Sequence, residues 1–488
     1  MKKMLSLILA VLMLTSFAAC AGESSGNNAD DTTAQDTGTT AETTTAVQYE
    51  APEVNDYEGY EYRIGINDSR NKDASIIIAE EANGEAFNDA VYERNENISE
   101  LYTIKIKGLV AESNSIVTKM QTAVLAGDDL YDVAAMGMRQ HFPLAQEGMF
   151  HELNSLDCID FSQPWWDESI LEAFEVKGKN YTVVGDYLTS DDVFILILLF
   201  NSKLYTDLGF EDPYEMVFSG NWVFDRFMEM AMSGSVDLNG DGNMDKNDRW
   251  GLLSEASAYY YFSTGAGFMP LERDSKGDLS YNIDSERNFN IFEKVKKFSH
   301  DRSICILASD ITDFSPYSTV WLLCDNMFIE NQALFKSCNF NDVVNYRTME
   351  MDFGVIPVPK FDESQEEYAN LVTNHSDALV FPVTVSDIER TMNITDAIGY
   401  ESMLSLSPCF YEVFLDEKLV RDENSKAMID IILDTKKFDL EWTANISGFV
   451  DVLIKLAQSR NDNLASEWAA ISGSAASKLD AFIAKFED

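Results

Sequence analysis

The hydrophobic pattern along the first third of the chain alternates between short strand-like runs and longer helix-like segments. The predicted elements are, in order, a strand at 60–66, a helix at 87–102, a strand at 103–110, a helix at 116–126 and a strand at 130–136. This order is typical of a parallel sheet with helices on its faces. Ligands bind such sheets beyond the carboxyl ends of the strands, so we look for a site first in the loop 137–141.

The later chain keeps the same mixed pattern, with longer helices. The very apolar run 194–200 is too short to cross a membrane and predicts a buried strand. The other predicted elements are helices at 222–232 and 285–300, a largely helical segment at 318–337, a strand at 250–253 and a proline-broken strand at 353–359. We therefore expect an α/β protein whose hydrophobic residues are numerous enough to form the cores of more than one domain.

The first 20 residues have the pattern of an export signal. Lys2 and Lys3 precede the apolar run 4–17, which is short for a membrane span and ends in Ala18-Ala19-Cys20. Small residues followed by Cys resemble a bacterial lipobox, which implies lipidation of Cys20. The alternative is an ordinary signal peptide, 1–19, with a chance Cys at its end. The following residues are mainly Ser, Gly, Asn, Asp, Thr and Ala, so 20–55 is expected to be a lipid-anchored flexible tether.

The charge balance excludes one class of partner. The chain has 83 acidic and 36 basic residues, a net charge of −47, and such a body is repelled by phosphate backbones. We expect no nucleic-acid partner. Besides Cys20 five cysteines remain, an odd number, and a disulfide among Cys305, Cys324 and Cys338 stays open.

One acidic segment follows the spacing of a calcium-binding loop. Oxygen-bearing side chains stand at loop positions one, three, five, seven, nine and twelve, and Gly242 at position six allows the sharp turn. The expected ligands are Asp237, Asn239, Asp241, Asn243, Asp245 and Asp248. Asp at position twelve is shorter than the usual Glu, so we expect a single structural Ca²⁺ site. The alternative is a polar turn without metal.

The sequence contains no recognisable catalytic signature. It has no Gly-x-Ser-x-Gly elbow, no His-Glu-x-x-His pair and no Walker-type loop, and its 4 histidines lack metal-ligand spacing. A pair of glycosidase carboxylates stays open among the 83 acidic residues.

An ordered set of short phrases resembles the carbohydrate-type extracellular solute-binding proteins of bacterial ABC importers. The phrases are Gly84-Glu85, Asn88–Asn95, Ala126-Gly127-Asp128, Pro164–Asp167, Phe200–Lys203, Gly220-Asn221-Trp222 and Phe353–Lys360. The resemblance implies a periplasmic-binding-protein-like fold with two α/β lobes, joined by a hinge that the chain crosses several times. The implied boundaries are 56–190 with 355–405 for the first lobe, and 195–350 with 410–488 for the second. The cleft between such lobes closes on ligand.

The candidate ligand-binding residues come from aromatic chemistry and from this resemblance. Trp165 and Trp166 offer aromatic faces of the kind that stack on sugar rings, although the same pair also fits a role in core packing. By position, the loop after the third strand resembles the sugar-contacting loop of maltose-type binding proteins, which has an aromatic residue, an Asp and an Arg where this chain has Met136, Arg139 and Gln140. The contacts of that loop do not transfer, but Arg139 could still donate to a ligand. The remaining candidates are Glu255, Tyr259, Thr264, Asn331 and His375.

The expected function is capture of a sugar or oligosaccharide and its delivery to an ABC permease, without catalysis. We expect a monomer, lipid-anchored at the extracellular face of the bacterial cytoplasmic membrane. A lipid-anchored surface glycan hydrolase is the principal alternative, and a structural or adhesive surface protein is the third. A hydrolase would release reducing ends from glycans, whereas a binding protein would only be stabilised by them.

Overall fold

The computed structural model describes residues 49–68, 77–112, 115–343, 346, 351–414, 423–461 and 463–487. Met1–Ala51 and Pro52–Asp488 form two separate units, and the second carries all the elements described below. The signal peptide, the lipidation site at Cys20 and most of the expected tether lie outside the described residues. The boundaries of the two expected lobes stay a prediction.

The first sheet is built mainly from the N-terminal part of the second unit. Its four described strands are, in spatial order, β12 (Asp377–Val380), β3 (Val133–Gly137), β1 (Tyr60–Asp68) and β2 (Ile104–Glu112). The strands β1, β2 and β3 are parallel, as the alternating strand and helix pattern predicts. The strand β12 joins antiparallel, with Asp377 opposite Gly137.

The second sheet has five described strands and is also mixed. In spatial order they are β10 (Phe353–Ile356), β4 (Leu196–Asn201), β9 (Ala333–Asn339), β5 (Trp250–Ser254) and β8 (Cys305–Leu307). The strands β8 and β9 lie parallel to β5, and β4 is antiparallel to β9. Every residue of β4 is buried, because β4 lies inside the sheet and both of its faces are covered. Two short strand pairs complete the list: β11 (Asn370–Leu371) with β13 (Lys436–Lys437), and β6 (Leu271–Arg273) with β7 (Leu279–Tyr281).

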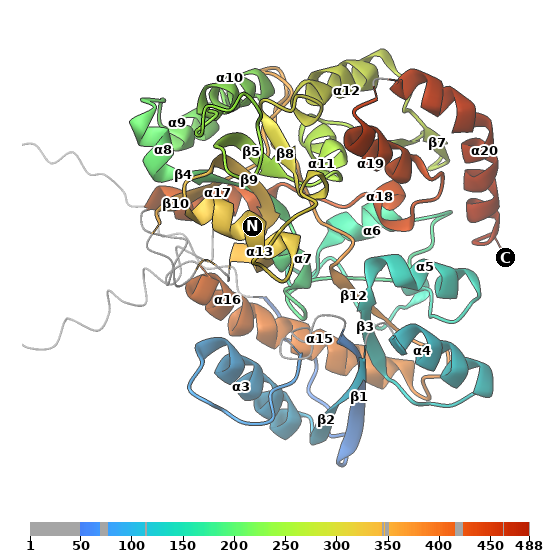
Figure 1. Cartoon of the computed structure of the whole chain (residues 1–488). Helices are drawn as coiled ribbons and strands as arrows, with labels where there is room; N and C mark the ends of the chain where they lie inside the picture. Colours follow the sequence, from blue (N-terminus) through green and yellow to red (C-terminus); the bar gives the residue numbers. More distant parts are fainter. Residues whose placement is uncertain are drawn as a thin grey trace, which may run out of the picture. The chain divides into compact units, whose positions relative to one another are not determined.

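Helices cover both sheets and connect most of the strands (Figure 1). Those before β5 are α3 (Ala86–Leu101), α4 (Ser115–Ala126), α5 (Met138–Gln146), α6 (Glu168–Phe174), α7 (Ser190–Val193), α8 (Ser202–Asp207), α9 (Pro213–Phe218) and α10 (Phe224–Gly234). Those after β5 are α11 (Ala258–Gly265), α12 (Glu286–Ser299), α13 (Val320–Ile329), α14 (Phe340–Val343), α15 (Ile388–Leu404), α16 (Leu406–Phe414), α17 (Glu423–Asp434), α18 (Leu440–Ala444), α19 (Phe449–Ser459) and α20 (Leu464–Ala484).

Two expectations about local structure are wrong. The predicted loop at 137–141 is the start of helix α5, whose internal Pro143 and short length hide the helical period. The predicted helical segment 318–337 is helical only over α13, and its remainder enters β9. Asn331 adopts a left-handed φ of 59° between these elements, and this turn redirects the chain into the sheet.

The chain passes between the two sheets in three connecting segments. The first, 185–195, leads into β4, and the second, 372–376, leads into β12. The third runs from 405 to 435, of which 415–422 lie outside the described residues. The first two segments touch, because the Thr373 N–H donates to the Phe194 carbonyl at 2.9 Å. Val372 also forms a bridge with Ile195.

Candidate functional site

The parallel strands of both sheets end beside the same connecting segments. In the first sheet β12 begins at the edge where β3 ends, and the second connecting segment leads into it. In the second sheet β4 begins at the edge where β9 ends, because Leu196 pairs with Asn339. The first connecting segment leads into that edge. The carboxyl edges of both sheets are therefore where we build the candidate site.

On the first sheet, three side chains gather around the end of β3. A Cβ atom at Gly137 would lie 3.4 Å from Cδ of Gln140 and 3.7 Å from Oδ1 of Asp377. The Met138 N–H donates to the Ser376 carbonyl at 2.9 Å, which fixes this corner. The Ser190 hydroxyl accepts from the Asp377 N–H at 2.9 Å and so ties the corner to the first connecting segment. Gln140 is partly exposed and offers both a donor and an acceptor.

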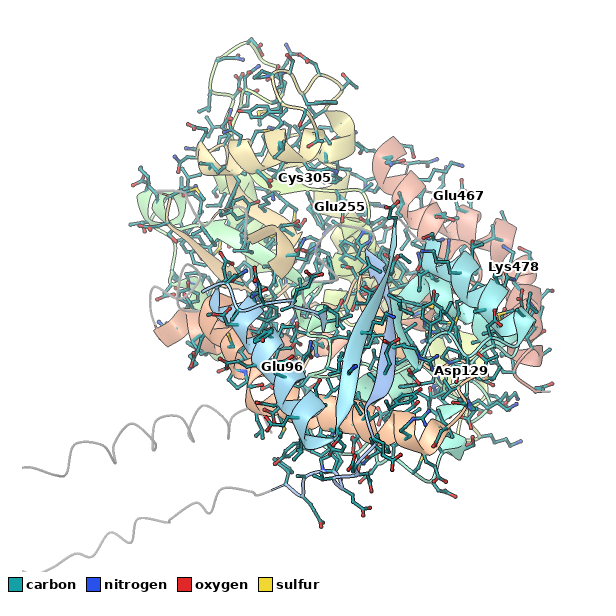
Figure 2. All side chains as sticks on the ribbon, turned by 90° about the horizontal axis from the view of Figure 1, so that it is seen from below. Glu96, Asp129, Glu255, Cys305, Glu467 and Lys478 are labelled. Atoms are coloured by element: carbon teal, nitrogen blue, oxygen red, sulfur yellow. The ribbon has the colours of Figure 1, made fainter. Side chains whose placement is uncertain are left out.

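On the second sheet, Glu255 directly follows β5, which pairs with β8. Figure 2 labels Glu255 and also Cys305, the first residue of β8. Burial raises the pKa of Glu255, while hydrogen bonds from Ser257 and Tyr261 lower it. The side chain is still partly exposed, so its carboxylate has acceptor capacity left for a ligand. Ser254 and Ser337 share a hydrogen bond of 2.6 Å at the same edge.

A buried charge cluster connects the segments between the sheets. The ammonium group of Lys436, in β13 directly after the third segment, lies 2.8 Å from Asp192 and 2.9 Å from Asp167, and it also contacts Asp191. Burial alone would lower the pKa of Lys436, but the three carboxylates raise it well above its usual range. Burial raises the pKa of Asp191 to about 6, against the opposing effect of Lys436. This cluster fixes the first and third segments to each other and to helix α6, which Asp167 caps.

The first connecting segment also holds a strained backbone. Thr189 has a left-handed φ of 51° and is buried, immediately before helix α7. A β-branched residue rarely adopts this conformation, and the cost is on the order of 1–3 kcal/mol.

The structure brings some of the sequence-predicted residues to the two edges. Gln140, Glu255 and His375 are there, and Arg139 lies beside Gln140 on the exposed side of α5. His375 belongs to the second connecting segment, and its ring lies 6.3 Å from that of Phe194.

Other predicted residues lie elsewhere. Tyr259 and Thr264 are buried inside α11, where the Tyr259 hydroxyl donates to the Phe292 carbonyl at 3.2 Å. Asn331 precedes β9, so it lies at the opposite edge of the second sheet, where it accepts a 2.9 Å hydrogen bond from Asn201. We do not include these three residues in the candidate site.

The tryptophan pair occupies a packed environment. Trp165 is 1% exposed and Trp166 is 5% exposed. Their indole N–H groups both donate to Oδ1 of Asp396 on α15, at 2.6 and 2.9 Å. This placement favours the packing role over the stacking role, and contact of the pair with a ligand stays a prediction.

The calcium-type loop adopts a closed turn in which its carboxylates bind backbone N–H groups. Asp237 accepts from Gly240 and Gly242 at 2.7 and 2.8 Å. Asp248 is fully buried and accepts from Leu238 and Asp245 at 2.9 and 2.8 Å. Among the described residues, no group of three or more His, Cys, Asp or Glu side chains has an arrangement that could hold a metal ion. Calcium binding by this loop stays a prediction.

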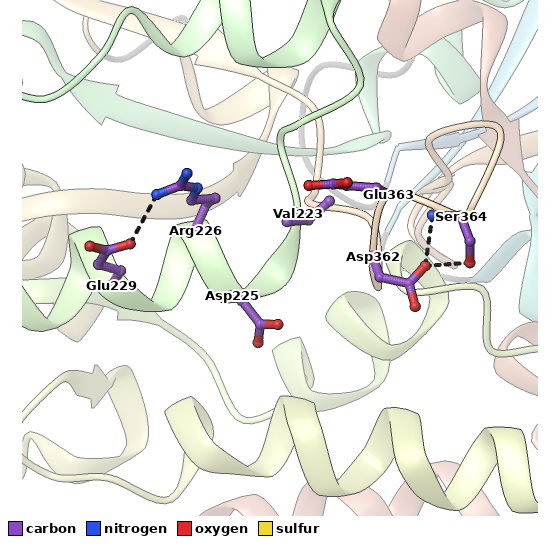
Figure 3. Close-up of a pocket in the computed structure, with 7 residues that line it drawn as sticks. All are labelled: Val223, Asp225, Arg226, Glu229, Asp362, Glu363 and Ser364. Carbon is purple, nitrogen blue, oxygen red and sulfur yellow. Dashed lines mark hydrogen bonds and ion pairs between the residues drawn. The ribbon is translucent and has the colours of Figure 1, made fainter.

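A separate pocket of about 440 Å³ lies at the start of α10 (Figure 3). Its lining residues are Val223, Asp225, Arg226, Glu229, Asp362, Glu363 and Ser364. Three of its four acidic groups are already partnered. Asp225 pairs with Lys294 at 3.0 Å, Glu229 pairs with Arg226 at 3.3 Å, and Asp362 accepts from Ser364. We therefore assign no ligand to this pocket.

Solved structures with a similar fold identify the architecture. The sugar-binding protein MalE from Xanthomonas citri matches with a TM-score of 0.58 and 14% identity, over 88% of this chain and 98% of that one. The chain has the fold of extracellular solute-binding proteins. The Listeria monocytogenes ABC substrate-binding protein Lmo0181, in complex with cycloalternan, matches with a TM-score of 0.53 and 14% identity. The match covers 88% of this chain and 99% of that one.

A further neighbour with the solute-binding-protein fold is a family 1 extracellular solute-binding protein from Bifidobacterium longum subsp. infantis. It matches with a TM-score of 0.53 and 11% identity, over 87% of this chain and 99% of that one. These neighbours are binding proteins and not enzymes. No protein-family model and no curated protein matches the sequence. In the described part of the chain, no helix is both long enough and apolar enough to cross a membrane.

Sequence reasoning missed Ser190 and Lys436. Each is an ordinary polar residue within its own segment, and its role arises only because distant segments meet. The one local signal was the acidic pair Asp191-Asp192, which lies just before the apolar strand β4. Because buried carboxylates need a partner of opposite charge, this pair predicts a buried cation nearby.

Proposed function

We propose that this chain captures a carbohydrate between the carboxyl edges of its two sheets and delivers it to an ABC permease. The observation that carries the proposal is the fold itself, matched over most of its length by binding proteins. Solved neighbours include a MalE domain bound to maltotriose and a cyclo/maltodextrin-binding protein complexed with maltotetraose. Gln140 and Glu255 supply the hydrogen-bonding groups that sugar hydroxyls need.

Closure of the two lobes would follow from the three connecting segments. The charge cluster of Lys436 holds these segments together, while the strained Thr189 is a position at which the backbone can turn. Hinges of this kind are a few residues that absorb a change in φ and ψ. Closure around a ligand would present a new surface to the permease.

The membrane attachment belongs to the same proposal. An importer's binding protein has to stay near its permease, and lipidation of Cys20 followed by the polar tether would achieve this at the extracellular face of the membrane. Growth of the producing strain with a labelled fatty acid should label the wild-type protein. The variant Cys20→Ala should carry no label and should leave the membrane fraction.

The test of ligand capture is a thermal-shift screen of residues 21–488 with mono- and oligosaccharides, followed by calorimetry on each hit. A ligand that binds only the native state raises the free energy of unfolding, by about 2.7 kcal/mol when its concentration is a hundredfold above Kd. The melting temperature therefore rises as well. Amino acids and short peptides serve as the contrasting classes. Stabilisation by those classes alone would overturn the carbohydrate assignment, and reducing-end release during incubation would favour the hydrolase alternative.

A further inference from the structure

Trp321 is the tryptophan that the fold leaves in contact with solvent. It is 54% exposed on helix α13, whereas the other 6 tryptophans are each at most 6% exposed. The adjacent Leu322 is 47% exposed. Burial of an indole contributes strongly to stability, so a half-exposed indole leaves much of that contribution unused. Core packing therefore does not explain why a tryptophan stands at this position.

The topology places the start of α13 toward the carboxyl edge of the second sheet. The strands β8 and β9 are both parallel to β5, so the crossover between them leaves from the carboxyl edge and returns to the opposite edge. Helix α13 ends at Ile329, four residues before β9 begins at Ala333. Its C-terminus therefore lies at the opposite edge, and its N-terminal turn points back toward Glu255 and Ser337.

An ion pair fixes the position of the helix along the sheet. Asp325 of α13 accepts from the Lys336 ammonium group at 2.7 Å, in the middle of β9. Trp321 is one helical turn, about 6 Å, closer to the carboxyl edge than Asp325 and lies on the same side of the helix. The Tyr346 hydroxyl donates to Asp325 at 2.7 Å on that side. Helix α14, which precedes Tyr346, packs on α7 of the first connecting segment.

The surroundings hold the start of helix α13 in place. The Thr319 hydroxyl caps α13 by accepting from the Leu322 N–H at 3.2 Å. The Tyr317 hydroxyl donates to Asn326 at 2.5 Å and ties the preceding loop to the helix. Farther back in that loop, Asp313 is held by Lys246 at 2.9 Å. An aromatic face presented on a fixed scaffold loses little entropy when it binds.

We propose that the indole of Trp321 stacks on one ring of an extended saccharide whose other rings lie between the carboxyl edges of the sheets. The inference rests on the proposed function and deepens it, because it assigns the ligand to the oligosaccharides. A monosaccharide held by Glu255 and Gln140 does not need a platform one helix layer away from the strand edge. Stacking on an apolar sugar face suits a neutral aromatic side chain, and it leaves the acidic surroundings uninvolved.

The experiment compares affinities along chain-length series. Calorimetry measures Kd for malto-, cello- and xylo-oligosaccharides from one to four units, with wild type, Trp321→Ala, Trp321→Tyr and Phe218→Ala. Phe218 is the matched control, because it is a 46% exposed aromatic residue on a different helix, at the end of α9. The shortest ligand that binds each variant reports whether its inner site is intact.

For the series that binds, we expect Trp321→Ala to lose about tenfold in affinity for the longest saccharide and to keep wild-type affinity for the shortest. Trp321→Tyr should recover most of the loss, and Phe218→Ala should match wild type. An equal loss at every length, or no loss at any length, would overturn the inference alone. Binding of no saccharide by wild type would overturn the proposed function and the inference with it.

Discussion

At the scale of single residues, the groups that hold the candidate site are buried polar side chains whose partners come from distant segments. Lys436 meets Asp167, Asp191 and Asp192, and Asp377 meets Ser190. Such groups stabilise the fold only while every partner is present, because an unpaired buried charge is costly. A change at Lys436 tests this view.

Removal of the Lys436 charge should destabilise the protein strongly. The variant Lys436→Met leaves three acidic groups around an uncharged side chain, and loss of one partner from a buried ion pair costs about 3–5 kcal/mol. The free energy of unfolding in urea measures the effect. The neighbouring Lys437→Met is the control and should stay within about 0.5 kcal/mol of wild type. Equal stability of the two variants would show that the cluster holds nothing together.

His141 should make stability fall as the solution becomes more acidic. Burial beside Phe142 and Phe174 lowers the pKa of His141 to about 3, from an ordinary value of 6.5. Between these values the unfolded chain binds a proton that the folded chain does not, so this residue lowers stability by about 1.4 kcal/mol for each pH unit below 6.5. Above pH 6.5 it has no such effect.

The measurement is the difference between wild type and His141→Leu in urea unfolding at pH 7 and at pH 5. Buried carboxyl groups with raised pKa values, such as Glu441 at about 7, act in the opposite direction, but they are common to both proteins. The pH dependence of the difference therefore isolates His141. A difference that is the same at both pH values would contradict the assignment.

At the scale of elements, the periodic segments were predictable and the boundaries between unlike elements were not. The strands at 60–66 and 250–253 and the helices at 87–102 and 285–300 are confirmed, since each has a clear period or apolar run. The segment 318–337 was predicted to be largely helical because no Gly or Pro separates α13 from β9. The turn there depends on the left-handed Asn331, whose side chain is fixed by Asn201 of a distant strand.

The loop 237–248 combines the spacing of a calcium site with an internal set of backbone hydrogen bonds. Asp248 accepts two backbone hydrogen bonds within it, so Asp248→Ala should cost about 1–3 kcal/mol whether or not a metal is bound. If the loop binds Ca²⁺, the metal should raise the melting temperature of wild type, and Asp241→Ala should abolish the rise. Asp241 is exposed, so its substitution should leave the metal-free protein near wild-type stability. No response of wild type to calcium or chelator would identify a metal-free turn.

At the scale of the whole molecule, the fold could be predicted and the site only in part. Alternating strands and helices, with the ordered phrases, led to a two-lobed solute-binding-protein fold, and solved structures confirm the architecture. The site is assembled from residues far apart in the chain, such as Ser190 and Asp377, and no local pattern shows which segments will meet. Gln140 and Glu255 were accessible to prediction because they follow strand ends.

The excess of acidic residues should make stability depend on salt. With 83 acidic and 36 basic residues, self-repulsion opposes the compact state, and added ions screen it. The melting temperature should therefore rise between 10 mM and 200 mM sodium chloride, concentrations over which the screening length falls from about 30 Å to under 10 Å. A melting temperature that falls with salt would show that favourable ion pairs outweigh the repulsion.

The order of strands in the first sheet also has a consequence for biogenesis. Its fourth strand, β12, ends at Val380, whereas β3, on which it pairs, ends at Gly137. A chain that emerges from the ribosome or an export channel N-terminus first cannot complete this sheet until all the strands of the second sheet have passed. The hydrogen-bonding edge of β3 stays open throughout that interval. Completion of the first sheet is thereby delayed, and the open edge of β3 can pair with other chains until β12 arrives.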